Sequence, residues 1–228
     1  MDKFTTKGQS LAAVQSNGSA LEYVPEEFKT VELCLIAVQN YGHALVYVPE
    51  ELKIKELCLA AVQNDVFALE YVPEKLKTAD LCFSAVHKAG SVLKYVPEEL
   101  KTVEICLLAV KDNGFALEYV PEKLKTAEIC FIAVQNHGFA LEYVPNELKT
   151  SELCLAAVQN YGHALKFVPE ALKTEKLCLT ATQIFMANVS YSNAIIYRYM
   201  DSFLDAVPKN LKRKIKKLIK DECFRRIK

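Results

Sequence analysis

The sequence lacks the short motifs that mark common catalytic and phosphate-binding sites. It holds no H-E-x-x-H zinc motif, no glycine-rich phosphate loop and no nucleophile elbow. No carboxylate stands isolated among apolar residues, where burial would tune an acid or a base. The four histidines are His43, His87, His137 and His163, and their spacing forms no cluster. We therefore expect no enzymatic activity, no catalytic residue, no metal site and no cofactor.

The sequence also lacks a long apolar segment. No stretch approaches the roughly 18–20 apolar residues that span a membrane. The first eight residues, Met1–Gly8, are polar and hold no apolar run of signal-peptide length. We therefore expect a cytoplasmic protein, and export by a signal-independent route is the alternative.

The chain has no net charge overall, but its charges are unevenly distributed along the sequence. The 228 residues carry a formal net charge of zero, which does not favour nucleic-acid binding by the whole molecule. Residues 209–228 nevertheless hold ten Lys and Arg against two acidic residues, so the rest of the chain carries the opposite excess. We expect this segment to form a basic helix with an apolar stripe. The stripe consists of Leu211, Ile215, Leu218, Ile219 and Ile227.

Prolines and cysteines recur every 24 residues. They lie at Pro25, Pro49, Pro73, Pro97, Pro121, Pro145 and Pro169, and at Cys34, Cys58, Cys82, Cys106, Cys130, Cys154 and Cys178. A fixed period of this length is typical of repeat proteins, in which stacked units share one core. The sequence therefore predicts an all-α solenoid.

One repeat, residues 102–125, shows how each unit should fold. Thr102 is a favourable N-cap, and Gly114 would end the helix as a left-handed C′ residue. The inward face of this helix comprises Ile105, Cys106, Ala109 and Val110. The spacing then predicts two short turns of 3-10 type, the second starting at Pro121.

The ends of the repeat array depart from the pattern. We assign residues 1–183 to the solenoid, with an N-terminal cap repeat over 1–29 and further repeats over about 30–183. In the cap repeat, Gly8, Gln9 and Ser10 replace the Glu, Leu and Cys of later repeats, as expected for an outer unit that no neighbour covers. Residues 184–228 are expected to hold an insertion, a degenerate repeat around Pro208 and the basic capping helix.

Three positions of the repeat hold almost the same residue in every unit, and we call the residues at one such position a column. Single cysteines 24 residues apart are too distant for disulfides and too sparse for a metal site, so we expect buried thiols in a reducing compartment. The tyrosine column, Tyr23 to Phe167, could stack nucleotide bases, but its uniformity favours a structural ladder. The lysine column, Lys29 to Lys173, lies between acidic columns and is expected to form a neutralised surface lattice.

Variable positions mark surface that is free to bind. The most variable columns flank the helix C-terminus and are rich in aromatic residues and histidine, which are favoured at interfaces. The candidate protein-binding edge comprises Tyr41, His43, Phe67, Phe115, His137, Phe139, Tyr161 and His163. The alternative interpretation is that this surface binds nothing and only tolerates substitution.

The basic C-terminal segment is a second candidate surface. Its residues could bind an anionic partner, nucleic acid or an acidic membrane, or the helix could serve only as a cap. The candidate anion-binding residues are Lys212, Arg213, Lys216, Lys217, Lys220, Arg225 and Arg226.

The string A-L-E-Y-V-P-E-x-L-K-T-x-E-L-C-L-x-A-V-Q-N-x-G resembles a domain-of-unknown-function family of short helical repeats. Such repeats occur in bacterial, protist and large-virus proteins, some suspected of acting on host cells. The match is strongest over 116–134 and extends over about 10–183. The resemblance implies an all-α repeat fold and transfers no activity, cofactor or site residue. The layout is also similar in geometry to leucine-rich-variant solenoids.

Three functions fit these observations. The first is a non-enzymatic protein-protein interaction scaffold, such as a host-directed effector or a neutraliser of another protein. The second is nucleic-acid or anionic-membrane binding through the basic helix. The third is a structural element, because an imperfect cap lets solenoids join end to end, so we expect a monomer or weak self-association.

Overall fold

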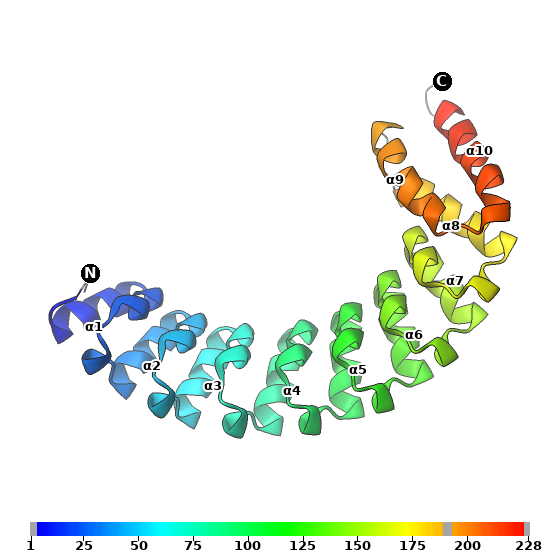
Figure 1. Cartoon of the computed structure of the whole chain (residues 1–228). Coiled ribbons are helices and arrows are strands. Elements are labelled where there is room, and N and C mark those ends of the chain that lie inside the picture. The colour runs from blue at the N-terminus through cyan, green and yellow to red at the C-terminus, as the bar shows by residue number, and fades with distance from the viewer. Residues whose placement is uncertain (1–3, 189–192, 226–228) are drawn as a thin grey trace. The chain divides into compact units, whose positions relative to one another are not determined.

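The computed structural model describes residues 4–188 and 193–225, which contain helices and no strand (Figure 1). The α-helices of the repeats are α1 (Lys7–Ser16), α2 (Val31–Asn40), α3 (Lys55–Asn64), α4 (Ala79–Lys88), α5 (Val103–Asp112), α6 (Ala127–Asn136), α7 (Ser151–Asn160) and α8 (Glu175–Asn188). Two further helices, α9 (Asn193–Asp205) and α10 (Lys209–Arg225), follow them. None of the helices described is both long and apolar enough to cross a membrane.

Two 3-10 helices separate each α-helix of the repeats from the next. The longer ones are η1 (Gly18–Tyr23), η3 (Gly42–Tyr47), η5 (Val66–Tyr71), η7 (Gly90–Tyr95), η9 (Gly114–Tyr119), η11 (Gly138–Tyr143) and η13 (Gly162–Phe167). The shorter ones are η2 (Glu26–Phe28), η4 (Glu50–Leu52), η6 (Glu74–Leu76), η8 (Glu98–Leu100), η10 (Glu122–Leu124), η12 (Asn146–Leu148) and η14 (Glu170–Leu172). The predicted all-α repeat fold, one α-helix and two 3-10 turns per unit, is confirmed.

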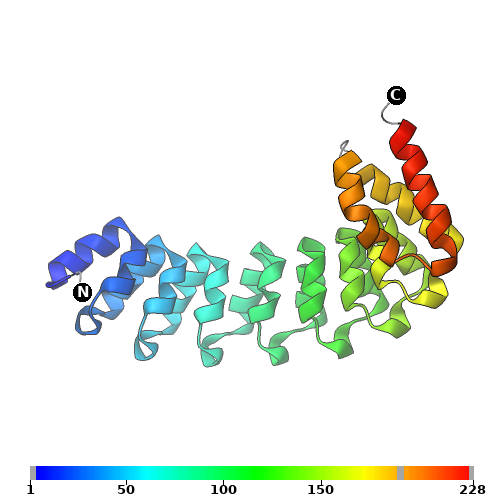
Figure 2. The same ribbon diagram turned by 45° about the horizontal axis from the view of Figure 1, so that its top comes forward.

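The chain divides into two compact units, Met1–Ala109 and Val110–Lys228, with the boundary inside α5. In the first unit, α1 to α4 pack in chain order, and η1, η3, η5 and η7 form a parallel second row. In the second unit, α6 to α8 form one row, and η9, η11 and η13 form the other (Figures 1 and 2). Each unit thus has two layers, and the core lies between them.

Threonine caps begin most of the repeat helices, as the sequence predicts. Thr102 Oγ1 accepts a hydrogen bond from the Ile105 amide at 3.3 Å, which satisfies one of the free donors of the first turn. The same contact is made by Thr30, Thr78, Thr126, Thr150 and Thr174. Ile54 replaces threonine before α3, where no side chain caps the helix.

The repeat glycines serve a purpose that the sequence interpretation missed. The prediction that Gly114 adopts a left-handed C′ conformation is wrong, because no glycine in the part described has positive φ. Each glycine instead opens a 3-10 helix pressed against the next α-helix. A Cβ on Gly138 would lie 2.5 Å from the Ala157 carbonyl oxygen, so glycine is needed for close approach of the repeats.

An asparagine at the end of the next helix fastens the same junction. The Asn160 side chain accepts from the Gly138 amide at 2.7 Å and donates to the Gln135 carbonyl at 2.9 Å. In the first unit, Asn64 makes the equivalent pair of bonds to Gly42 and Gln39, at 2.7 and 2.8 Å. These bonds fix the register of successive repeats next to the helix C-termini.

The cysteine column is part of the core, as predicted. Its seven residues are buried free thiols. Burial raises the pKa of the Cys130 thiol to about 11, since an apolar environment disfavours the thiolate. These thiols therefore pack as small apolar groups between the two helical layers.

The prediction that the lysine column forms a neutralised surface lattice is wrong. Its ion-paired side chains are only 5–12% exposed. Lys125 Nζ contacts Glu122 at 2.7 Å within its own repeat and donates to the Tyr143 carbonyl of the next repeat at 3.0 Å. Lys29, Lys77 and Lys149 make the same carbonyl bond, so these largely buried side chains link repeats rather than form a surface lattice.

The first helix departs from one detail of the predicted polar cap. Gly8 and Gln9 are exposed, as expected for an uncovered end. Ser10, in the cysteine column, is instead fully buried, and its hydroxyl donates to the Thr6 carbonyl at 3.1 Å. A small residue remains necessary there because α2 still packs against α1.

Three helices close the second unit. α10 packs against both α8 and α9, and α9 reaches η13 (Figure 2). Ile215 and Ile219 are buried as predicted and Leu211 is half-buried, whereas Leu218 is 40% exposed and the prediction for it is wrong. Leu218 lines a groove between α8 and α10. Ile227 lies outside the described residues.

Candidate functional site

In the first unit, the predicted edge residues lie at helix ends. Tyr41 follows the last residue of α2, and its ring stacks on His43 with centroids 5.7 Å apart. His43 Nδ1 lies 2.6 Å from an Asp65 carboxylate oxygen, and its ring meets Tyr71 edge-on at 5.7 Å. Phe67, on η5, is 38% exposed. The first unit therefore presents a small polar-aromatic cluster beside a single exposed ring.

In the second unit, all five predicted edge residues form one continuous row. Phe115 contacts His137 with ring centroids 4.1 Å apart, and His137 lies 6.0 Å from Phe139. Phe139 meets Tyr161 edge-on at 4.7 Å, and Tyr161 stacks on His163 at 5.5 Å. We call Phe115, His137, Phe139, Tyr161 and His163 the aromatic edge. Each of these residues is half-buried.

The local fold explains why two sequence columns alternate along this edge. His137 and Tyr161 occupy the position after α6 and α7, in extended conformation. Phe115 and Phe139 are the second residues of η9 and η11 and lie 22 positions before their partners. Because these 3-10 helices pack against the end of the next α-helix, one side chain from each column meets at the two junctions.

The aromatic edge continues into residues that sequence reasoning did not identify. The His163 ring lies 5.1 Å from Phe185 on α8 and 5.6 Å from Phe203 on α9. Phe185 and Phe203 stack at 4.6 Å with nearly parallel rings. These residues lie in or after the insertion, where the 24-residue period ends. Their aromatic character was the only available signal.

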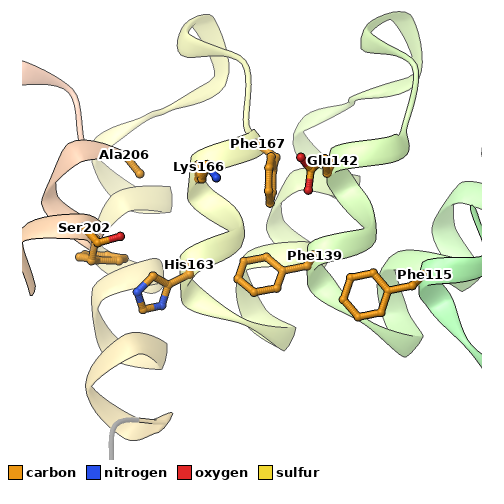
Figure 3. Close-up of a pocket in the computed structure, with 9 residues that line it drawn as sticks. Phe115, Phe139, Glu142, His163, Lys166, Phe167, Ser202 and Ala206 are labelled. Atoms are coloured by element: carbon orange, nitrogen blue, oxygen red, sulfur yellow. The ribbon is translucent and has the colours of Figure 1, made fainter. Parts of the chain in front are cut away.

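A pocket of about 330 Å³ opens where the edge reaches α9 (Figure 3). It is lined by Phe115, Phe139, Glu142, His163, Lys166, Phe167, Ser202, Phe203 and Ala206. Phe115, Phe139 and His163 lie in a row, and Phe167 stands over Phe139 from the same side as Glu142 (Figure 3). The Phe139 and Phe167 rings are perpendicular, with centroids 5.8 Å apart.

Glu142 and Lys166 were not predicted as site residues, although their column carried a signal. The column reads Glu22, Val46, Glu70, Lys94, Glu118, Glu142 and Lys166. It varies in the sign of its charge from one repeat to another. The same test of variability that selected the aromatic edge would have selected this column too.

The histidines of the aromatic edge are neutral at neutral pH. Burial lowers the pKa of His163 and of His137, because desolvation disfavours the imidazolium. The buried Nδ1 of His137 has no hydrogen-bond partner among the described residues. Over the same described part, no three or more His, Cys, Asp or Glu residues are grouped to hold a metal ion.

The predicted tyrosine ladder lies beside the edge and supports it. Its members are mostly half-buried, and Tyr23 is exposed. Contacts to edge residues are made by Tyr71, which meets His43, and by Phe167, which meets Phe139. Two members of the column therefore contact predicted edge residues.

The basic helix α10 presents a charged face to solvent. Lys212 pairs with Asp205 at 3.3 Å, and Arg225 pairs with Glu222 at 3.0 Å. Four other predicted residues are exposed and make no ion pair within 4–188 and 193–225. They are Arg213, Lys216, Lys217 and Lys220. Arg226 lies outside the described residues.

Comparison with known proteins identifies one family. The model of a domain of unknown function, DUF4116, matches residues 10–53, 54–101, 79–125, 102–149 and 126–173. These overlapping matches follow the repeat array from the first helix to the seventh and cover most of the chain. Neither a curated protein nor a solved structure matches the chain.

Proposed function

Since the chain belongs to the DUF4116 family, whose function is unknown, we propose on its own structure that it is a non-enzymatic protein-interaction scaffold. The observation that carries this proposal is the aromatic edge. Five aromatic or imidazole side chains line one border of the second unit in mutual contact. Aromatic residues are enriched at protein interfaces and supply large contact area at low entropic cost.

The scaffold holds this edge rigid. Gly138 and Gly162 leave no room for a side chain between repeats. Asn160 bonds both Gly138, which precedes Phe139 in the chain, and Gln135 near the end of α6. A preorganised surface loses less entropy on binding than a flexible one. A host-directed effector and a neutraliser of another protein would both use such a surface.

Affinity capture with the full chain tests this proposal. Phe115→Asp with Phe139→Asp is expected to abolish recovery of a protein partner from a nuclease-treated lysate. Phe139→Ala should weaken it. Circular dichroism must show that the variants are folded, and Glu128→Lys on the exposed face of α6 is the matched control. Equal recovery by the double variant and the control would contradict the proposal.

A second candidate function is binding of nucleic acid or an anionic membrane through α10. It is favoured by the four exposed basic residues without ion pairs. Charge reversal of Lys212, Arg213, Lys216 and Lys217 should then abolish binding, and affinity should fall steeply with salt. The α10 interpretation fails if binding survives that reversal. In the scaffold proposal the reversed variant keeps its partner.

We further propose that the protein acts in the cytoplasm, as a monomer or with weak self-association. Eight buried cysteine thiols in one small protein favour a reducing compartment. Molar mass measured across a range of concentrations tests the assembly state. A mass that rises to a fixed oligomer would instead favour a structural, self-assembling role.

A further inference from the structure

The pocket at the α9 end of the aromatic edge has the size of a single side-chain site. Its volume of about 330 Å³ lies at the lower limit of the roughly 300–1,000 Å³ typical of small-molecule sites. One large side chain fits such a space, and a dinucleotide or other bulky cofactor does not. Interfaces commonly use pockets of this kind to hold one aromatic anchor.

The walls of the pocket suit an aromatic guest. Phe139 and Phe167 already adopt a perpendicular arrangement at 5.8 Å, so a third ring would meet both a face and an edge within the usual range of about 4.5–7 Å. Phe203 is fully buried and is backed by the stacked ring of Phe185. Phe203, stacked on Phe185, thus forms a packed wall of the pocket.

Two opposite charges flank the opening. Glu142 and Lys166 occupy the same position in successive repeats, both are exposed, and both line the pocket (Figure 3). They form no ion pair with each other within the part of the chain that is described. Lys166 Nζ lies 5.0 Å from the Phe167 ring centroid. A guest therefore meets an acidic group on one side and a basic group on the other.

We propose that this pocket binds an extended segment of a partner protein that inserts one aromatic side chain between a basic and an acidic residue. The basic residue pairs with Glu142, and the acidic residue pairs with Lys166. Successive repeats lie on the order of 10 Å apart, which an extended peptide spans in about three residues. The inference rests on the protein-binding function proposed above and specifies what that surface recognises.

Short peptides test the charge preference directly. The probes are acetylated and amidated heptapeptides with a central Phe, Tyr, Trp or Ala, flanked by Lys and Glu, by two Lys or by two Glu. Fluorescence anisotropy with the full chain should show the aromatic Lys/Glu peptides binding tightest. Replacement of the aromatic residue by Ala should weaken binding at least tenfold. No detectable binding by any peptide at millimolar concentration overturns the proposal.

Variants of the two charges make the test independent of peptide direction. Glu142→Lys should shift the preference to peptides with two Glu, and Lys166→Glu should shift it to peptides with two Lys. Glu128→Lys, on the exposed face of α6, is the control and should leave the preference unchanged. An unchanged preference in both pocket variants overturns the proposal.

A blocking variant separates this proposal from the general scaffold function. Ser202→Trp should fill the pocket and abolish peptide binding, whereas Asp201→Trp, on the same helix outside the pocket, should not. If partner capture depends on Phe115 and Phe139 but survives Ser202→Trp, the pocket inference is wrong and the scaffold function stands. If recovery of the partner is unchanged in all of these variants, the scaffold function itself is wrong.

Discussion

At the scale of single residues, a lysine with a largely buried side chain links successive repeats within each unit, as Lys29, Lys77, Lys125 and Lys149 show. From the sequence alone, Lys125 and Glu122 are expected to form a surface salt bridge. Such pairs contribute roughly 0–1 kcal/mol to the free energy of unfolding. The structure adds a bond from the same ammonium to the Tyr143 carbonyl. Lys149 lacks the ion pair because Asn146 replaces the glutamate, and burial lowers its pKa. The carbonyl bond therefore forms even where the ion pair is absent, since Lys149 donates to the Phe167 carbonyl at 3.3 Å.

Loss of this link should measurably weaken the fold. We expect Lys125→Met to lower the free energy of unfolding by about 1–3 kcal/mol, because a charged hydrogen bond is lost and the Tyr143 carbonyl loses its donor. Lys123→Met, at an exposed position of η10, should change it by less than about 0.5 kcal/mol. Urea unfolding of the two variants measures the difference. Similar free energies of unfolding for the two variants would show that Lys125 contributes no more to stability than a surface lysine.

The imidazole of His137, whose buried Nδ1 has no hydrogen-bond partner among the described residues, should make the second unit sensitive to acid. Because burial lowers its folded-state pKa, its contribution to stability is present above the unfolded-state pKa of about 6.5. That contribution is lost as pH falls through the folded-state pKa. His137→Tyr, the residue of the same column at Tyr41 and Tyr161, should therefore lose less stability between pH 7 and pH 5.

Thermal melts at the two pH values measure this effect. His87→Gln is the control, since His87 is exposed and Gln is its column's usual residue. Its pH dependence should match that of the unchanged chain. Parallel behaviour of His137→Tyr and His87→Gln would show that His137 is not the acid-sensitive group.

At the scale of elements, close contact between a 3-10 helix and the next α-helix sets the repeat spacing. Gly138→Ala would place a Cβ 2.5 Å from the Ala157 carbonyl oxygen. We expect this overpacking to cost about 1–3 kcal/mol, measured by chemical unfolding. Gly8→Ala has nothing within 4 Å and lies in α1, so it should be neutral or stabilising by about 0.5–1 kcal/mol. Equal effects would refute the close-approach explanation.

The periodic columns made most of the elements predictable. Threonine caps, the cysteine face and Pro121 each correspond to an observed helix boundary or core column, because those signals act within one repeat. The burial of Lys125 was not predictable in this way, since its partner carbonyl lies 18 residues ahead in another repeat. Gly114 was correctly placed at the helix boundary, but the reason given was wrong. The clash that a side chain there would make is with the next repeat, so the neighbouring sequence does not reveal it.

The candidate site was predictable only where the period holds. Phe115, His137 and Phe139 lie together because two variable columns meet at each junction. Phe203 and Ser202 follow an insertion, so no column pointed to them. Their position at the edge depends on how α9 packs against η13, which composition and spacing do not encode.

At the scale of the whole molecule, the core thiols should report unfolding. The seven column cysteines are buried, and the pKa of Cys34, like that of Cys130, is raised to about 11. We expect a small thiol reagent to leave them unmodified in the native protein and to modify all seven in denaturant. Mass spectrometry after timed labelling measures this. A column cysteine that reacts at the rate of a free thiol would contradict the packing role.

The protein's proposed function depends on which surface touches a partner. A photo-crosslinking residue placed in turn at Phe115, at Glu128 on α6 and at Lys216 on α10 of the full chain compares three surfaces under the same conditions. We predict a discrete crosslinked protein from position 115, and none from 128 or 216. A discrete product from position 216 or 128, with none from 115, would contradict the claim that the aromatic edge is the binding surface.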